Sequence, residues 1–152
     1  MVKSKAWNWD IVEGSHKNYW LEPAVESYYL IDRWLSRRKK DFLIWGACGL
    51  GRHTIQFAKA GFSTSGFDLS ETSVSRTEEY AKKSGVEVDL KVGDMLNLPY
   101  KNQGFDCIYC RNVISHTDTN GMKKIVSELK RVLRKDEECY LTLGSKESWG
   151  FR

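Results

Sequence analysis

The sequence holds only two prolines, no long apolar run and little excess of charge of either sign. A transmembrane helix needs roughly 20 successive apolar residues, so we expect no membrane-spanning segment. The opening residues, MVKSKAWNWD, contain no apolar stretch of the kind found in a secretory signal. The 24 basic and 20 acidic residues are intermixed and leave a net charge of +4, which does not require a nucleic-acid partner. We therefore expect neither a membrane nor a nucleic acid among the partners.

The four cysteines do not form the pattern of a disulfide framework or a metal site. Cys48, Cys107, Cys110 and Cys139 each lie in or beside an apolar stretch, which is typical of buried, reduced thiols in a cytosolic protein. Cys107 and Cys110 form a CxxC pair, but FDCIYC has the pattern of a strand, in which residues three apart point to opposite faces. No second pair or suitably spaced histidine completes a zinc site. We expect a cytoplasmic location and no bound metal.

Apolar periodicity divides the chain into strands that alternate with helices. With 152 residues, of which 41% are hydrophobic, the chain can build the core of one domain. The apolar face of the first helix is marked by residues at helical spacing: Val25, Tyr28, Tyr29, Leu30, Ile31, Trp34 and Leu35. The alternation predicts an α/β fold with a parallel sheet, helices on both faces and ligands bound beyond the carboxyl ends of the strands. We predict strands at 42–45, 63–67, 86–92, 105–110 and 139–143, and helices at 22–38, 52–59, 71–83 and 122–134.

The first two loops at this edge carry a glycine-rich turn and an acid. Gly49 and Gly51 have no Cβ, so a ligand can approach the backbone closely, although many such turns are glycine-rich for packing reasons alone. Asp68 ends the second strand, where a carboxylate can accept hydrogen bonds from the two hydroxyls of a ribose. The alternative is that Asp68 only prepares the helix cap at Ser70. Together with the glycine turn, Asp68 favours the ribose interpretation.

The third and fourth loops also end in residues that could contact a ligand. Asp94 could bind the amino edge of an adenine while Met95 covers its face; the alternative is a turn residue followed by a core methionine. Each polar residue after the fourth strand is a weak signal by itself. Those residues are Arg111, Asn112, Ser115 and His116.

Taken together, these loops resemble those of class I S-adenosylmethionine-dependent methyltransferases. The similar stretches are CGLGRHTIQFAKAGFSTSGFDLSETSV, KVGDMLNLPYKNQGFDCIYCRNVISH, SELKRVLRK and ECYLTLG, so the resemblance covers roughly 41–144. It implies a three-layer, Rossmann-like sandwich with a mostly parallel sheet of about five strands. It also implies S-adenosylmethionine as cofactor, S-adenosylhomocysteine as product and a small-molecule methyl acceptor. The implied cofactor-binding residues are Ala47, Cys48, Gly49, Gly51, Asp68, Leu69, Asp94, Met95 and Arg111.

Two positions depart from the family's glycine-rich motif and leave a second function open. Trp45 stands where the family has an acid close to the amino-acid end of the cofactor, and Ala47 stands where it has glycine. The alternative function is therefore a catalytically inactive binding or scaffold protein with impaired cofactor binding. A short-chain nicotinamide oxidoreductase is disfavoured, because Tyr80 is followed four residues later by Ser84 rather than by lysine. We assign no catalytic residue; His116 has the best location for a base, and a loop histidine without a role is the alternative.

The expected domain is a single methyltransferase-like unit over 1–152. It comprises a helical N-terminal segment (1–40), a cofactor-binding core (41–144) and a tail (145–152). The family has two further strands after the fifth, and their absence here would leave the fifth strand at a sheet edge. We therefore expect one of three explanations: the sequence is shortened at its C-terminus, the tail covers this edge, or two copies of the chain pair through it.

Overall fold

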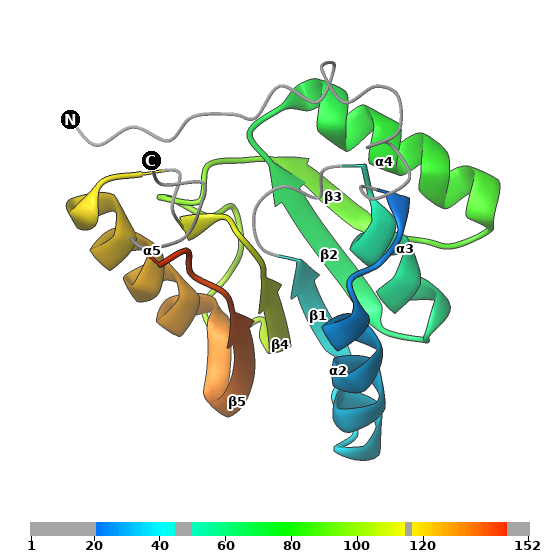
Figure 1. The fold of residues 1–152 in the computed structure, drawn as a ribbon, viewed down its shortest axis with the longest axis horizontal. Coiled ribbons are helices and arrows are strands. Elements are labelled where there is room, and N and C mark those ends of the chain that lie inside the picture. Colours follow the sequence, from blue (N-terminus) through cyan, green and yellow to red (C-terminus); the bar gives the residue numbers. More distant parts are fainter. Residues whose placement is uncertain (1–20, 45–49, 115–116, 146–152) are drawn as a thin grey trace.

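The computed structural model describes residues 21–44, 50–114 and 117–145. Its centre is a sheet of five parallel strands in the order β3-β2-β1-β4-β5, so the direction of strand progression reverses between β1 and β4 (Figure 1). The predicted α/β fold with a mostly parallel sheet is confirmed. The strands are β1 (Asp41–Ile44), β2 (Ser63–Asp68), β3 (Asp89–Val92), β4 (Phe105–Cys110) and β5 (Leu133–Leu141). The helices are α2 (Val25–Ser36), α3 (Arg52–Lys59), α4 (Glu71–Ser84) and α5 (Thr119–Val132).

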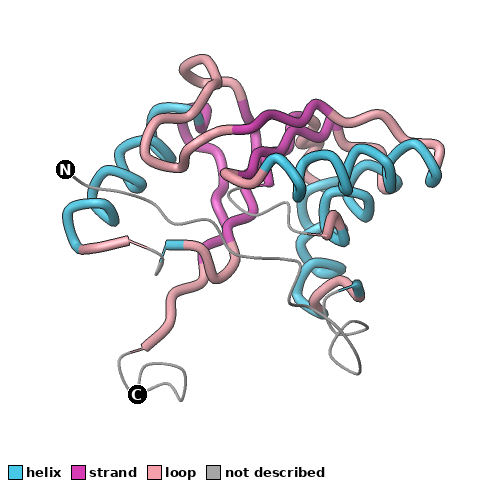
Figure 2. Tube along the Cα trace, turned by 90° about the horizontal axis from the view of Figure 1, so that it is seen from above, coloured by secondary structure: helices cyan, strands magenta, loops and turns pink. Residues whose placement is uncertain are grey.

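Helices cover both faces of the sheet (Figure 2). Alternate strand residues pack into the two cores. On one face, Phe42 and Ile44 of β1 belong to a cluster with residues of α2, α3 and α4. On the other face, Leu43 packs in a cluster that includes α5. Cys107 belongs to the first cluster and Cys110 to the second, so the prediction that this CxxC pair points to opposite faces is confirmed.

Trp34 is the main anchor of α2 on the sheet. Its side chain is fully buried and its ring lies 5.9 Å from that of Phe57, which is stacked on Phe42 at 4.0 Å. The indole N–H donates to Oε2 of Glu138 on β5 at 2.8 Å, and Arg33 donates to both oxygens of the same carboxylate. Hydrogen bonds from Arg33 and Trp34 lower the pKa of Glu138 to about 2 against the opposing effect of burial. Apolar and ionic contacts therefore fix α2 to β5 together.

The predicted apolar face of α2 is only partly correct. Leu30 and Trp34 are buried, together with Ser27, but Val25 is 85% exposed and Tyr29 is 66% exposed. The helix carries two apolar rows at helical spacing, and packing on the sheet covers one of them. Periodicity identifies the rows but does not select between them.

Several element boundaries also differ from the sequence prediction. α2 spans Val25–Ser36 rather than 22–38, and the bounds of β1, β2 and α4 differ by one residue. β3 begins at Asp89 rather than at residue 86, and α5 begins at Thr119, because Asp118 accepts the N–H of Gly121 at 2.8 Å and so caps the helix earlier. β5 begins directly after α5, in a segment where the sequence predicted a charged turn. Its pairing register with β4 shifts between Phe105 and Cys107. Cys139 on this strand is exposed, contrary to the expected buried thiol.

Candidate functional site

The carboxyl ends of β1, β2, β3 and β4 lie along one edge of the sheet, which is where the sequence predicts a ligand site. Several predicted site residues follow these strands directly. The loop after β1, with Ala47, Cys48 and Gly49, lies outside the described residues, as do Ser115 and His116. The candidate site is therefore described from the start of α3 and from the loops after β2, β3 and β4.

Gly51 opens helix α3 in a conformation that favours glycine. Its φ is +84°, and a Cβ built on it would lie 2.9 Å from Cγ2 of Thr77 on α4. A side chain at this position would be strained by the backbone and would collide with a packed neighbour. The backbone conformation at position 51 and the packing of Thr77 against it therefore explain why this residue is a glycine.

Asp68 is held in a fixed orientation at the end of β2. The side chain is buried, with 3% exposure. Oδ1 accepts the N–H of Ser70 at 2.9 Å, and Oδ2 accepts the hydroxyl of Ser73 at 3.1 Å. Ser70 in turn caps α4 by accepting the N–H of Ser73, as predicted. The carboxylate thus supports the start of α4, which was the alternative role considered for it, and it stands at the edge where the ribose role was expected.

Asp94 and Met95 form a turn directly after β3. Oδ1 of Asp94 accepts the N–H of Leu96 at 2.9 Å, and its carbonyl accepts the N–H of Asn97 at 3.0 Å. Met95 is buried in the core cluster that includes Phe67 and Leu98. These contacts match the turn and core roles that the sequence left open. The loop is joined to β2, since the N–H of Gly93 donates to the carbonyl of Asp68 at 2.9 Å.

An ion pair on α5, between the buried Glu128 and the partly exposed Arg131, binds the continuation of this loop. The carboxylate of Glu128 accepts the N–H of Leu98 at 2.8 Å and a hydrogen bond from Nη2 of Arg131 at 2.7 Å. Arg131 also donates to the carbonyls of Leu98 and Tyr100. Hydrogen bonds from Arg131 lower the pKa of Glu128 although burial opposes the shift. Glu128 thus stays negatively charged while it binds the N–H of Leu98, in the loop that carries Asp94.

Arg111 follows β4 and pairs with a residue that the sequence did not single out. Its Nε donates to Oε1 of Glu26, in the first turn of α2, at 2.7 Å. Tyr109 donates its hydroxyl to the same oxygen at 3.3 Å. Burial works to raise the pKa of Glu26, but hydrogen bonds from the backbone, Arg111 and Tyr109 and the charge of Arg111 lower it. Glu26 is therefore a carboxylate with a fixed partner at the carboxyl end of β4.

His53 ties the start of α3 to the start of α2. Its Nε2 accepts the N–H of Ala24 at 3.0 Å and lies 3.4 Å from the hydroxyl of Tyr109. Burial, together with the charges of Arg52 and Arg111, lowers the pKa of His53 to about 3. The prediction that His53 is structural agrees with these contacts. No signal in the sequence pairs it with Tyr109 or Ala24, because both lie far away along the chain.

The edge of the sheet thus divides into two groups of polar residues. Asp68 and Asp94 follow the neighbouring strands β2 and β3. Arg111 follows β4, on the other side of β1, and joins Glu26. Leu69, which is 37% exposed, follows Asp68 directly. A ligand that bound along the whole edge would meet fixed carboxylates at one end and an acid–base pair at the other.

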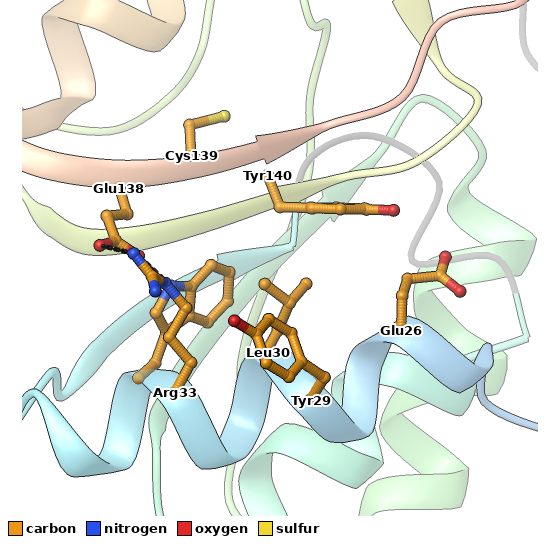
Figure 3. Close-up of a pocket in the computed structure, with 8 residues that line it drawn as sticks. Glu26, Tyr29, Leu30, Arg33, Glu138, Cys139 and Tyr140 are labelled. Carbon is orange, nitrogen blue, oxygen red and sulfur yellow. Dashed lines mark hydrogen bonds and ion pairs between the residues drawn. The ribbon is translucent and has the colours of Figure 1, made fainter.

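A cavity of about 470 Å³ lies between α2 and β5 and extends to Glu26 (Figure 3). Tyr29, Leu30 and Tyr140 form much of its wall. Arg33 and Glu138 lie at the end opposite Glu26. The acid–base pair at the end of β4 therefore adjoins a largely aromatic and aliphatic hollow.

Two features are absent from the part of the chain that the structure describes. No cluster of three or more histidine, cysteine, aspartate or glutamate side chains with metal-binding geometry occurs among residues 21–44, 50–114 and 117–145. Within the same ranges, no helix has the length and apolar character needed to cross a bilayer.

Comparison with known proteins places the chain in a family. Residues 46–136 match the methyltransferase domain family. The chain is similar to norajmaline N-methyltransferase from Rauvolfia serpentina, at 36% identity over 100 residues, which cover 64% of this chain and 33% of the relative. It is also similar to 27-O-demethylrifamycin SV methyltransferase from Amycolatopsis mediterranei, at 30% identity over 134 residues, covering 80% of this chain and 48% of the relative.

A solved structure shows the same fold. An S-adenosylmethionine-dependent methyltransferase from Clostridium acetobutylicum superposes with a TM-score of 0.65 at 24% identity, covering 76% of this chain and 48% of that one. The chain spans about half or less of the length of each of these relatives. Since the matched region makes up more than half of its residues, the chain belongs to the methyltransferase domain family.

Proposed function

We propose that this chain binds S-adenosylmethionine and transfers its methyl group to a small-molecule acceptor. Family membership supports the cofactor class, and the names of the two curated relatives support a small-molecule acceptor. The bound cofactor would supply an electrophilic methyl group on a sulfonium. The contribution of the protein would be to hold that group in line with a nucleophile, which is catalysis by proximity and orientation.

The proposed cofactor-binding residues follow the four strand ends. In the described part of the chain, the side chains suit the parts of the cofactor in different ways: carboxylates for hydroxyl and amino groups, and apolar side chains for the adenine face. The full proposed set is Ala47, Cys48, Gly49, Gly51, Asp68, Leu69, Asp94, Met95 and Arg111.

The observation that carries the proposal is the fixed carboxylate of Asp68 at the end of β2. β2 is the strand next to β1, whose following loop is glycine-rich. Two hydrogen bonds orient the carboxylate before a ligand arrives, so little conformational entropy is lost on binding. A charged acceptor in a mostly buried position binds hydroxyl donors more strongly than one in water.

Isothermal titration with S-adenosylhomocysteine tests this proposal. The unaltered protein should bind, and Asp68→Ala should weaken binding by about 10- to 100-fold, since hydrogen bonds to a charged group are lost. Ser73→Ala is the matched control, because it removes one partner of Asp68 but keeps the carboxylate. Equal affinities of the Asp68 variant and the unaltered protein would contradict the proposed role.

A second candidate function is a binding or scaffold protein with the same fold and impaired cofactor binding. Its support is the sequence: Trp45 and Ala47 stand in the loop after β1, where an acid and a glycine are typical of the family. The same titration separates the two functions. Absence of heat and of a thermal shift at millimolar ligand would favour the scaffold. Recovery of binding on restoring an acid at Trp45 and a glycine at Ala47 would identify those two residues as the cause.

The edge position of β5 also supports a proposal about assembly. In the described sheet β5 pairs with β4 on one side only. Backbone N–H and C=O groups on the outer side of such a strand can pair with a second copy. We propose a homodimer through β5. A sedimentation experiment that finds a monomer across the micromolar range would contradict it.

A further inference from the structure

Glu26 and Arg111 form an ion pair that is partly exposed to solvent. Their side chains keep exposures of 32% and 22%, and Nε of Arg111 lies 2.7 Å from Oε1 of Glu26. Glu26 lies in the first turn of α2, where the unpaired N–H groups of a helix favour a negative charge. The pair is therefore charged, oriented and accessible in part to a ligand.

Three contacts of the surrounding chain hold the pair in position. Ala24, two residues before Glu26, donates its N–H to His53 at 3.0 Å, and Arg52 donates to the carbonyl of Glu22 at 2.8 Å. On the β4 side, Tyr109 donates its hydroxyl to Glu26. These contacts fix the start of α2 against the start of α3 and the end of β4. The positions of the acid and the base thus belong to the folded framework, rather than to two freely moving side chains.

The pair brings one negative and one positive group together, and the guanidinium of Arg52 adds a second positive charge next to His53. His53 stays neutral because burial lowers its pKa to about 3, and burial raises the pKa of Tyr109. Glu26 keeps its negative charge and Arg111 its positive charge. An adjacent carboxylate and guanidinium are complementary to a ligand group that carries an ammonium and a carboxylate on one carbon. That group is the zwitterion of an α-amino acid.

The location of the pair agrees with this complementarity. It lies at the carboxyl end of β4, beside the reversal of strand order between β4 and β1, where ligands of open parallel sheets bind. The loop after β1 begins with Trp45, whose indole offers no carboxylate to an ammonium group. Glu26 of α2 supplies a carboxylate at the carboxyl end of β4.

We infer that Glu26 and Arg111 together bind the zwitterionic methionyl end of S-adenosylmethionine, with Glu26 accepting from the ammonium and Arg111 donating to the carboxylate. This inference rests on the proposed function, because it assumes that the adenosyl part binds along the same edge. It gives α2, an element outside the sheet and its loops, a direct role in selecting the ligand.

The test compares two ligands that differ only in the inferred contact. S-Adenosylhomocysteine carries the amino-acid group, whereas 5′-methylthioadenosine keeps the adenosine and the thioether but has no charged end. For Glu26→Gln, calorimetry should show about 10- to 100-fold weaker binding of S-adenosylhomocysteine and a change of less than about twofold for 5′-methylthioadenosine. Asp32→Asn is the matched control, because it removes the same charge from an exposed position on the same helix and should change neither affinity.

A ligand-side measurement covers the case in which Glu26→Gln perturbs the fold. On the unaltered protein, the deaminated analogue of S-adenosylhomocysteine should bind about 10- to 100-fold more weakly than the parent. Glu26→Gln should add no further loss for this analogue, because the partner of Glu26 is already missing. Equal losses for both ligands in the variant, or an unaltered protein indifferent to the amino group, would overturn the inference. Failure of the unaltered protein to bind either nucleoside would instead overturn the proposed function.

Discussion

The two groups of polar residues at the carboxyl edge are assembled over very different distances along the chain. Asp68 accepts from groups two and five residues away, and Asp94 accepts from one two residues away. The bond between Arg111 and Glu26 spans 85 residues. The first group consists largely of turns that form from neighbouring residues, whereas the second exists only after α2 has docked on the sheet. The difference implies that the Glu26–Arg111 group depends much more on tertiary stability.

The largest expected effect comes from undocking α2. Trp34→Ala removes a fully buried ring packed on Phe57 and a hydrogen bond to Glu138, and it should lower the free energy of unfolding by about 3–5 kcal/mol. Urea unfolding followed by circular dichroism measures this loss. Leu35→Ala, on the same helix but 44% exposed, is the control and should cost less than about 1 kcal/mol. Similar losses for both variants would show that α2 is not anchored through Trp34.

The next effect is a pH dependence that only the docked state creates. His53 has a pKa of about 3 in the fold against 6.5 when unfolded, so the unfolded chain binds more protons between these values. Stability from neutral His53 is therefore complete above about pH 6.5 and falls toward pH 3, by at most about 1.4 kcal/mol per pH unit.

The variant His53→Gln isolates this contribution. Glutamine keeps an acceptor for the N–H of Ala24 but does not titrate, so its unfolding free energy should fall less than that of the unaltered protein between pH 7 and pH 5. Urea unfolding at the two pH values gives the difference. Parallel pH profiles for the two proteins would mean that His53 is not held neutral by the packing of α2.

A further effect concerns the start of α3, beside the group formed by Asp68 and Asp94. Gly51→Ala adds a Cβ where φ is +84° and where Thr77 is only 2.9 Å away, and it should cost about 1–3 kcal/mol. Gly85→Ala is matched, because its φ is +68° and no atom lies within 4 Å, so it bears the backbone cost of about 1 kcal/mol alone. Thermal unfolding of both variants separates the steric part from the backbone part. Equal losses would remove the role of Thr77.

The sequence predicted the elements more reliably than their packing. The helix at 52–59 and the strand at 105–110 have the predicted bounds, because their ends are marked by glycine or by the limits of an apolar run. Periodicity did not show which apolar row of α2 is buried, so Tyr29 was wrongly expected in the core. β5 was expected to begin later, because ion pairs such as that of Arg134 with Asp106 on β4 cannot be recognised from the order of residues.

For the candidate site, the sequence identified residues at strand ends and missed those that other elements bring to them. Asp68 and Arg111 were predicted to lie at the edge because each stands at the end of an apolar strand, and the structure places them there. Glu26 was missed because a glutamate in the first turn of a helix is common and usually solvated. Only its contact with Arg111 and Tyr109 distinguishes it.

The sequence by itself determined the α/β alternation, the parallel sheet and the edge at which polar residues gather, because these follow from short-range periodicity and from turn residues. The tertiary structure alone decided which face of α2 is buried, that His53 is neutral and that an acid from α2 meets a base from β4. These features depend on contacts between residues far apart in the chain, and their strength comes from burial, which exists only once the helices have packed on the sheet.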